Sequence, residues 1–309
     1  MPSAVRRARS TCASVMAPAC TSAATGTLIV DVGFNVGQDS AAYLEMGHYV
    51  LAVEANPLLH EWATHTSPFK QAIAAGRLEL LNRAIVGHND TTALVPFYIS
   101  KESEANRIGS CFKSPCTVRA VPTITCASLL QRAISKGLPP LYLKSDVEGY
   151  DTACLRSIIA AAADSSGHGL SCLPRYMSFE DNVAAHQPTL MRLVAAGYRH
   201  FKYIDQLPSY GTEGPISAKH GYHGAGSGPF GEFAFDRVTR YGWRSVEAVV
   251  AANQRVPGRK HLLAGHLKKG HLQGDLHVKL NNSWLFDADA MQQMLLSWQR
   301  PVTWPLSAA

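Results

Sequence analysis

The chain has 309 residues, of which 46% are hydrophobic and 17% are charged, and it carries a formal net charge of +6. This composition is typical of a globular protein and excludes wholesale disorder. The positive charge is spread along the chain, which favours a solvated basic surface over nucleic-acid binding, and no apolar run reaches the length of about 18 residues that a membrane span requires.

The N-terminal segment differs from the rest of the chain in composition. Residues 1–26 contain three arginines and no acidic residue, a pattern typical of a disordered start or of a plastid or mitochondrial transit peptide. The segment has no long hydrophobic stretch, which argues against a secretory signal. We therefore divide the chain into this segment, a domain at 27–244 and a C-terminal extension at 245–309 that packs on the domain.

A strand, a tight turn, a helix and a second strand are predicted at the start of the domain. The apolar run 27–30 leads to Asp31, where the glycine-rich pattern D-V-G-x-N-x-G begins. A helical stretch at 38–46 and a second apolar run at 49–53, which ends at Glu54, come next. This order predicts a parallel α/β sheet that binds a nucleotide-like ligand.

Three residues of this unit indicate the kind of ligand. Gly33 and Gly37 can adopt positive φ and let a ligand approach the backbone closely. Glu54 stands 23 residues after Asp31, where a carboxylate suits the two hydroxyls of a ribose. The close glycine pair of the G-x-G-x-x-G pattern is missing, because Phe34 intervenes, and this weakens pyrophosphate binding. The pattern therefore favours a ligand that contains adenosine but no phosphate.

Helices and strands are predicted to alternate along the rest of the domain. Helical periodicity covers 58–75 with a break at Pro68, and later elements are expected at 78–81 (strand), 123–136 (short strand and helix), 139–146 (strand), 152–163 (helix), 175–179 (strand), 190–196 (helix) and 198–204 (strand). The turn-forming residues Asn89 and Asp90 predict a hairpin over 86–100.

The seven cysteines form no C-x-x-C pair, and their number is odd. Several stand in apolar surroundings, as Cys154 does in a helical run. This pattern predicts buried, reduced thiols in an intracellular, cytoplasmic protein, with a disulfide between Cys111 and Cys116 as the alternative in another compartment.

Four motifs, taken in this order, resemble the FkbM family of methyltransferases. They are D-V-G-F-N-V-G-Q at 31–38, V-E-A-N-P at 53–57, L-K-S-D-V-E-G-Y-D at 143–151 and S-F-E-D at 178–181. The resemblance covers about residues 27–240 and implies a doubly wound α/β fold of the class I methyltransferase type, with a mostly parallel seven-stranded sheet and one late strand reversed. It also implies S-adenosyl-L-methionine as the cofactor.

The resemblance assigns cofactor binding to residues that follow the first three strands and the fourth long strand. In this fold class the loop after the third strand lies by the adenine, which implies contacts from Asn82 to Ala84. The full set implied by the resemblance is Asp31, Gly33, Asn35, Gly37, Glu54, Asn56, Asn82, Ala84 and Asp146.

Methyl transfer to a hydroxyl benefits from a general base near the ends of the later strands. The candidates are Asp146, Glu148, Glu180 and His186. The family usually has an apolar residue where this chain has Ser145, a change expected to loosen strand packing while it leaves both nearby carboxylates in place.

A metal-dependent variant of this chemistry is the alternative. Asp146, Asp181 and Asn182 supply three oxygen ligands, a set that resembles the magnesium site of catechol-type O-methyltransferases.

The expected activity is O-methylation of a small molecule or a glycan, with S-adenosyl-L-methionine as the methyl donor. A protein that binds the cofactor without turnover and an NAD-dependent oxidoreductase are the alternatives. The carboxylates at 146, 148 and 180 argue against the first, and the missing close glycine pair argues against the second. No nucleic-acid partner and no membrane span are expected, and the pattern selects neither a particular acceptor nor an oligomeric state.

Overall fold

The structure is a computed structural model, and it describes residues 27–100, 106–111, 114–138, 140–164, 170–180, 187–205 and 274–280. The N-terminal segment 1–26 and most of the predicted extension 245–309 lie outside these residues. Within the described part of the chain, no helix has the length and apolar character needed to cross a membrane.

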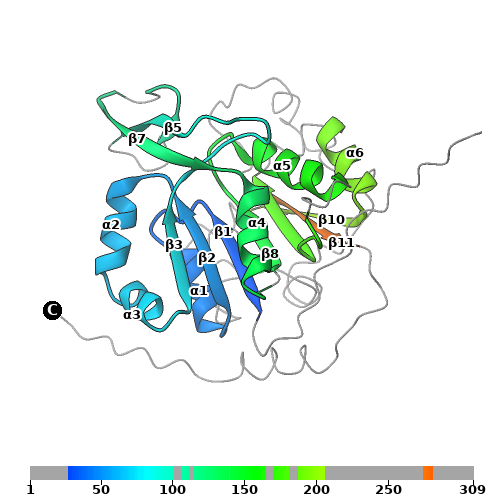
Figure 1. The fold of residues 1–309 in the computed structure, drawn as a ribbon, viewed down its shortest axis with the longest axis horizontal. Helices are drawn as coiled ribbons and strands as arrows, with labels where there is room; N and C mark the ends of the chain where they lie inside the picture. Colours follow the sequence, from blue (N-terminus) through cyan, green and yellow to red (C-terminus); the bar gives the residue numbers. More distant parts are fainter. Residues whose placement is uncertain are drawn as a thin grey trace, which may run out of the picture.

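A mostly parallel sheet forms the centre of the molecule (Figure 1). Its seven strands are β1 (Leu28–Val32), β2 (Tyr49–Glu54), β3 (Leu78–Asn82), β8 (Pro140–Ser145), β9 (Tyr176–Glu180), β10 (Tyr198–Asp205) and β11 (Gly274–Leu280). They lie in the order β10-β11-β9-β8-β1-β2-β3. The five strands from β9 to β3 pair in parallel, whereas β11 is antiparallel to both of its neighbours. The predicted α/β class and mostly parallel sheet are confirmed.

Within the described ranges, six helices flank this sheet. They are α1 (Gln38–Glu45), α2 (Pro57–His65), α3 (Phe69–Ala74), α4 (Cys126–Ser135), α5 (Asp151–Ala163) and α6 (Gln187–Ala195). The predicted break at Pro68 is confirmed, because it separates α2 from α3. Proline disfavours continuation of a helix, since its ring clashes with the preceding turn and it lacks an N–H.

Two apolar cores lie on the two faces of the sheet, as β1 illustrates. All five residues of β1 are buried, and its side chains alternate between the faces. Val30 joins the core that contains α4, α5 and α6 residues, whereas Ile29 joins the core that contains α1, α2 and α3 residues. A strand covered on both faces is a continuous apolar run, which explains why this strand was predictable.

A second, smaller sheet shows that the predicted hairpin over 86–100 is wrong. Its strands are β4 (Ala84–Ile85), β5 (Leu94–Ser100), β6 (Arg107–Ile108) and β7 (Cys116–Ile124), in the order β4-β7-β5-β6. The strand β5 pairs antiparallel with β7, and β4 pairs in parallel with the end of the same strand. Val95, Phe97 and Ile99 of β5 pack with Val121 of β7 in a core of their own, and this long-range packing decides the pairing.

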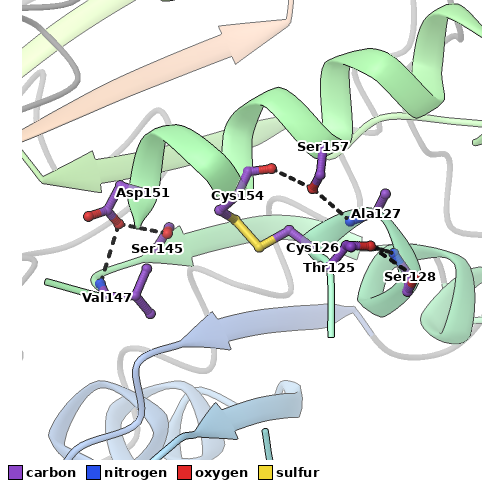
Figure 2. Close-up of a disulfide and its surroundings, with 9 residues drawn as sticks. All are labelled: Thr125, Cys126, Ala127, Ser128, Ser145, Val147, Asp151, Cys154 and Ser157. Atoms are coloured by element: carbon purple, nitrogen blue, oxygen red, sulfur yellow. Dashed lines mark hydrogen bonds between the residues drawn. A yellow bond between two sulfur atoms is a disulfide. The ribbon is translucent and has the colours of Figure 1, made fainter. Parts of the chain in front are cut away.

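The prediction of reduced thiols is also wrong for the described cysteines. Cys111 is bonded to Cys116, Cys126 to Cys154, and Cys172 is disulfide-bonded as well. Figure 2 shows the Cys126–Cys154 disulfide, which joins the first turns of α4 and α5. The two Cα atoms lie 5.0 Å apart although 28 positions separate the residues in the chain, so the sequence alone concealed the pair. The described cysteines therefore do not indicate an intracellular compartment.

Candidate functional site

The carboxyl edge of the main sheet brings together four of the predicted site residues. Asp31 is the penultimate residue of β1, and Glu54 is the last residue of β2. Asn82 ends β3, and Asp146 follows β8 directly. The strand register places Glu54 beside Asn82, and Asp31 beside Lys144. Parallel α/β sheets bind their ligands at this edge, so these residues define the candidate site.

The turn after β1 is packed against the loop after β8. Gly33 has φ of +96°, and a Cβ atom at this position would lie 1.9 Å from the carbonyl oxygen of Asp146. The Asp146 N–H donates to the carbonyl oxygen of Val32 at 2.8 Å, which holds the two segments together. Gly33 is therefore required for the approach of the protein's own backbone, whereas the sequence had suggested only the approach of a ligand.

Gly37 also makes room for the protein itself. A Cβ atom there would lie 2.4 Å from the rings of both Phe34 and Phe69. These two rings pack edge to face, with centroids 5.0 Å apart. Because Gly37 has no side chain, the rings of Phe34 and Phe69 can pack together where α1 begins beside α3.

Glu54 links the loops that follow β1 and β2. One carboxylate oxygen accepts a hydrogen bond from the Asn35 N–H and the other accepts one from the Asn56 N–H, each at 2.7 Å. Burial raises the pKa of the Glu54 carboxyl to about 7, although the two N–H groups oppose the shift. Asn35 has φ of 51°, in the left-handed region, so the turn is held in a conformation that this residue type tolerates better than most.

Three other predicted residues make contacts within the protein. Asn56 caps α2, since its side-chain oxygen accepts a hydrogen bond from the Leu58 N–H at 3.0 Å. Asn82 donates through Nδ2 to the backbone oxygen of Glu54 at 2.8 Å. Ala84 lies in β4 and its side chain is fully buried. The contacts of these residues with the rest of the protein stabilise the loops after β2 and β3.

A buried lysine binds three carboxylates at the same edge. The nearest carboxylate belongs to Asp39, 2.7 Å from Lys144 Nζ. Those of Asp146 and Asp31 follow at 3.5 and 3.7 Å. Burial alone would lower the pKa of the Lys144 ammonium, but the charges of these three aspartates outweigh burial and hold that pKa well above its usual value.

Among the described residues of this lysine cluster, carboxylates outnumber ammonium groups. Three carboxylates and one ammonium give a formal charge of −2. Asp31 is fully buried, and one of its oxygens accepts a hydrogen bond from the Ser40 hydroxyl at 2.6 Å. Burial raises the pKa of Asp31 to about 6, against the opposing charge of Lys144. Because neighbouring carboxylates repel one another, this arrangement of charges suits a positively charged ligand.

Two of the four predicted catalytic residues lie in the loop after β8. The Asp146 side chain is 42% exposed, so its carboxylate reaches both Lys144 and solvent. Glu148 has φ of 45°, a left-handed conformation that is uncommon for a residue with a side chain. Glu180 ends β9, where its backbone pairs with Asp275 of β11.

The remaining catalytic and metal candidates lie outside the described residues. They are His186, Asp181 and Asn182. Of the three ligands of the magnesium alternative, only Asp146 is described, and that alternative stays a prediction.

A comparison with protein families identifies the family of the chain. The chain matches a family model described as the methyltransferase FkbM domain over residues 31–200, which is more than half of its length. The chain belongs to the FkbM methyltransferase family. The resemblance predicted from the four motifs is confirmed, and no curated protein matches the chain. The matched range contains the whole lysine cluster. It also contains Glu54 and both residues that donate hydrogen bonds to it, Asn35 and Asn56.

Two residues of this FkbM domain were missed by sequence reasoning as site components. Lys144 carried a signal, because a lysine within an apolar strand is rarely buried without a partner. Asp39 carried none, since an acidic residue in the first turn of a helix is ordinary helix chemistry. Only the packing of α1 on β8 brings Asp39 to Lys144.

Proposed function

We propose that this FkbM domain transfers a methyl group from S-adenosyl-L-methionine to a hydroxyl of a small molecule or a glycan. The observation that carries the proposal is the edge lined by the carboxyl group of Glu54 and by the lysine cluster, beside the tight turn at Gly33. The strand order and the helices on both faces support assignment to the doubly wound class I methyltransferase type.

The residues at this edge fit the chemistry of the cofactor. Each oxygen of a carboxylate has two acceptor sites, and each oxygen of Glu54 uses one for a backbone N–H. A second acceptor site on each oxygen suits the two hydroxyls of a ribose. The negative charge around Lys144 suits the sulfonium and ammonium groups. When bound, the cofactor supplies an activated methyl group.

Asp146 and Glu148 are the described candidates for the general base. Asp146 combines solvent exposure with a position beside Lys144, so its carboxylate can meet a bound hydroxyl and accept the proton of that hydroxyl. Glu180 and His186 remain candidates for the same role, and a magnesium ion held by Asp146, Asp181 and Asn182 remains the metal-dependent alternative.

Calorimetric titration of the purified full chain with S-adenosylhomocysteine, and with NAD as the control, tests the proposal. We expect a dissociation constant on the order of micromolar for the first and no binding of the second. Binding of NAD alone would overturn the cofactor assignment, and binding of neither would overturn the proposed function.

The Glu54→Ala variant tests the ribose assignment within the same experiment. Loss of two charge-assisted hydrogen bonds should weaken S-adenosylhomocysteine binding about 10- to 100-fold, or roughly 1.4 to 2.8 kcal/mol. Glu61→Ala, which removes an exposed carboxylate on α2, is the matched control and should bind as the wild type does. Unchanged affinity in Glu54→Ala would refute the assignment.

A further inference from the structure

Asp151, the first residue of α5, is a buried carboxylate that the proposed chemistry does not use. Its side chain is fully inaccessible to solvent. One of its oxygens accepts hydrogen bonds from the Ser145 hydroxyl at 2.7 Å and from the Val147 N–H at 3.4 Å, as Figure 2 shows. Ser145 ends β8 and Val147 lies in the loop after it, so the two donors are the residues on either side of Asp146.

The loop that Asp151 holds is constrained from its other side as well. The Asp146 N–H is bonded to Val32 of β1, and the Asp146 carbonyl oxygen lies against Gly33. Glu148 takes up a positive φ of 45° next to Gly149 at 93°. A residue with a side chain keeps such a conformation only where the surrounding contacts determine it. The Asp151 carboxylate supplies contacts of this kind directly before Glu148.

Ser145 supplies the shorter of the two hydrogen bonds to Asp151. The family usually has an apolar residue at this position, and loosened packing was the expectation. The Ser145 side chain is instead 1% exposed, and its hydroxyl donates to Asp151. A buried hydroxyl without a partner is costly, so the serine and the aspartate stabilise one another.

The turn of α5 that carries Asp151 is itself anchored. Cys154 lies one helical turn further on and is bonded to Cys126 of α4. Ser157, in the next turn, accepts a hydrogen bond from the Ala127 N–H of α4 at 3.2 Å (Figure 2). The carboxylate of Asp151 therefore projects from a helix that is fixed to its neighbour, which makes it a rigid support.

We propose that Asp151 is a positioning residue, which sets the place of Asp146 and Glu148 at the carboxyl edge and thereby the affinity for S-adenosyl-L-methionine. The effect on affinity rests on the proposed function, whereas the effect on the loop does not. Asp151 acts through its oxygen as a hydrogen-bond acceptor. Asparagine keeps such an oxygen, whereas alanine does not.

The test compares Asp151→Ala and Asp151→Asn with Ser157→Ala as the matched control. Ser157 is also buried, hydrogen-bonded and part of α5, but it contacts α4 and not the loop after β8. Amide hydrogen exchange of the peptide that spans 144–150 reports the loop in the free protein. Titration with S-adenosylhomocysteine reports the affinity.

In Asp151→Ala we expect exchange at 144–150 to be at least about tenfold faster and the affinity at least about tenfold weaker. Asp151→Asn should restore both to within about threefold of the wild type, and Ser157→Ala should change neither. Exchange that is unchanged in Asp151→Ala, or raised equally in Ser157→Ala, would overturn the proposal.

Failure of the proposed function gives a different result. If the wild type binds no S-adenosylhomocysteine but exchange at 144–150 responds as expected, the role of Asp151 in the loop stands and the cofactor assignment fails. Should Asp151→Ala not fold, Ser145→Ala removes one of the two hydrogen bonds and is measured in its place. Faster exchange at 144–150 is again expected, and an unchanged rate would contradict the proposal.

Discussion

At the scale of single residues, Gly33 shows how closely two loops of the site meet. The position of its missing Cβ lies 1.9 Å from a backbone oxygen of Asp146, and backbone cannot swing away as a flexible side chain can. Gly47 has nearly the same φ, 92° against 96°, but a Cβ there would meet nothing within 4 Å. Alanine substitutions at the two glycines therefore distinguish the cost of backbone strain from the cost of steric overlap.

Gly47→Ala should lower the free energy of unfolding by about 1 to 3 kcal/mol, the range for backbone strain alone. Gly33→Ala should lower it by at least about 2 kcal/mol more, because the loop that carries Asp146 must also move. Urea unfolding of both variants measures the difference. Equal losses would show that the two loops are not in the contact described.

Glu54 belongs to the same scale and predicts a dependence on pH. Burial raises the pKa of its carboxyl from 4.5 to about 7, so the folded protein keeps a proton that the unfolded chain releases in this interval. The contribution of Glu54 to the unfolding free energy is therefore complete below about pH 4.5 and is lost as the pH rises through 7.

Glu54→Gln cannot titrate, and its stability relative to the wild type should rise by about 2 kcal/mol between pH 5 and pH 8. His48, whose pKa burial lowers to about 4, titrates in both proteins and cancels from the difference. Chemical denaturation of both proteins across this range measures it. A constant difference would contradict the shifted pKa of Glu54.

At the scale of elements, the Cys126–Cys154 disulfide fastens α4 to α5 beside the site. It closes a sequence separation of 28, against 5 for Cys111–Cys116. In the chain-entropy description, a longer loop loses more freedom in the unfolded state when it is closed. The helix pair is therefore expected to depend more on its disulfide than the smaller sheet does.

Replacing Cys126 and Cys154 together with alanine should lower the free energy of unfolding by about 3 to 4 kcal/mol, and the same change at Cys111 and Cys116 by about 2 kcal/mol. Cys126 and Cys154 are both fully buried, so lost packing acts in the same direction. Denaturation without reductant measures both. The reverse order would show that the helix pair is held by other contacts.

At the scale of the whole molecule, β11 joins distant parts of the chain. It lies between β9 and β10 and pairs antiparallel with both, although it follows β10 only after a long intervening segment. The boundary predicted at 244 would separate this strand from the sheet it pairs with. Loss of a central strand exposes two rows of unpaired backbone groups, which a sheet rarely tolerates.

A chain that ends at residue 244 should therefore lose cooperative unfolding, whereas a chain that ends at 285, which keeps β11, should retain it. Thermal unfolding followed by circular dichroism distinguishes them. A cooperative transition in the shorter chain would show that β9 and β10 hold without β11.

Local patterns in the sequence were sufficient for the family, the α/β class and most elements of the domain. β1 was predictable because a strand buried on both faces is a nearly continuous apolar run, in which Asp31 is the exception. The break at Pro68 was predictable because proline interrupts helices locally. The residues at the ends of β1 and β2 were found in the same way, since carboxylates that follow apolar strands mark the edge of a parallel sheet.

Tertiary structure decided which of these residues act on one another. The pairing of β5 with β7, the ion pair of Asp39 with Lys144 and the bond of Cys126 to Cys154 all join residues far apart in the chain. No local pattern encodes such contacts, because they depend on how helices and strands pack across the sheet. The sequence by itself determined most of the elements and the types of residue at their ends. Packing alone determined that Lys144 pairs with three aspartates and that Asp151 bonds to the loop after β8.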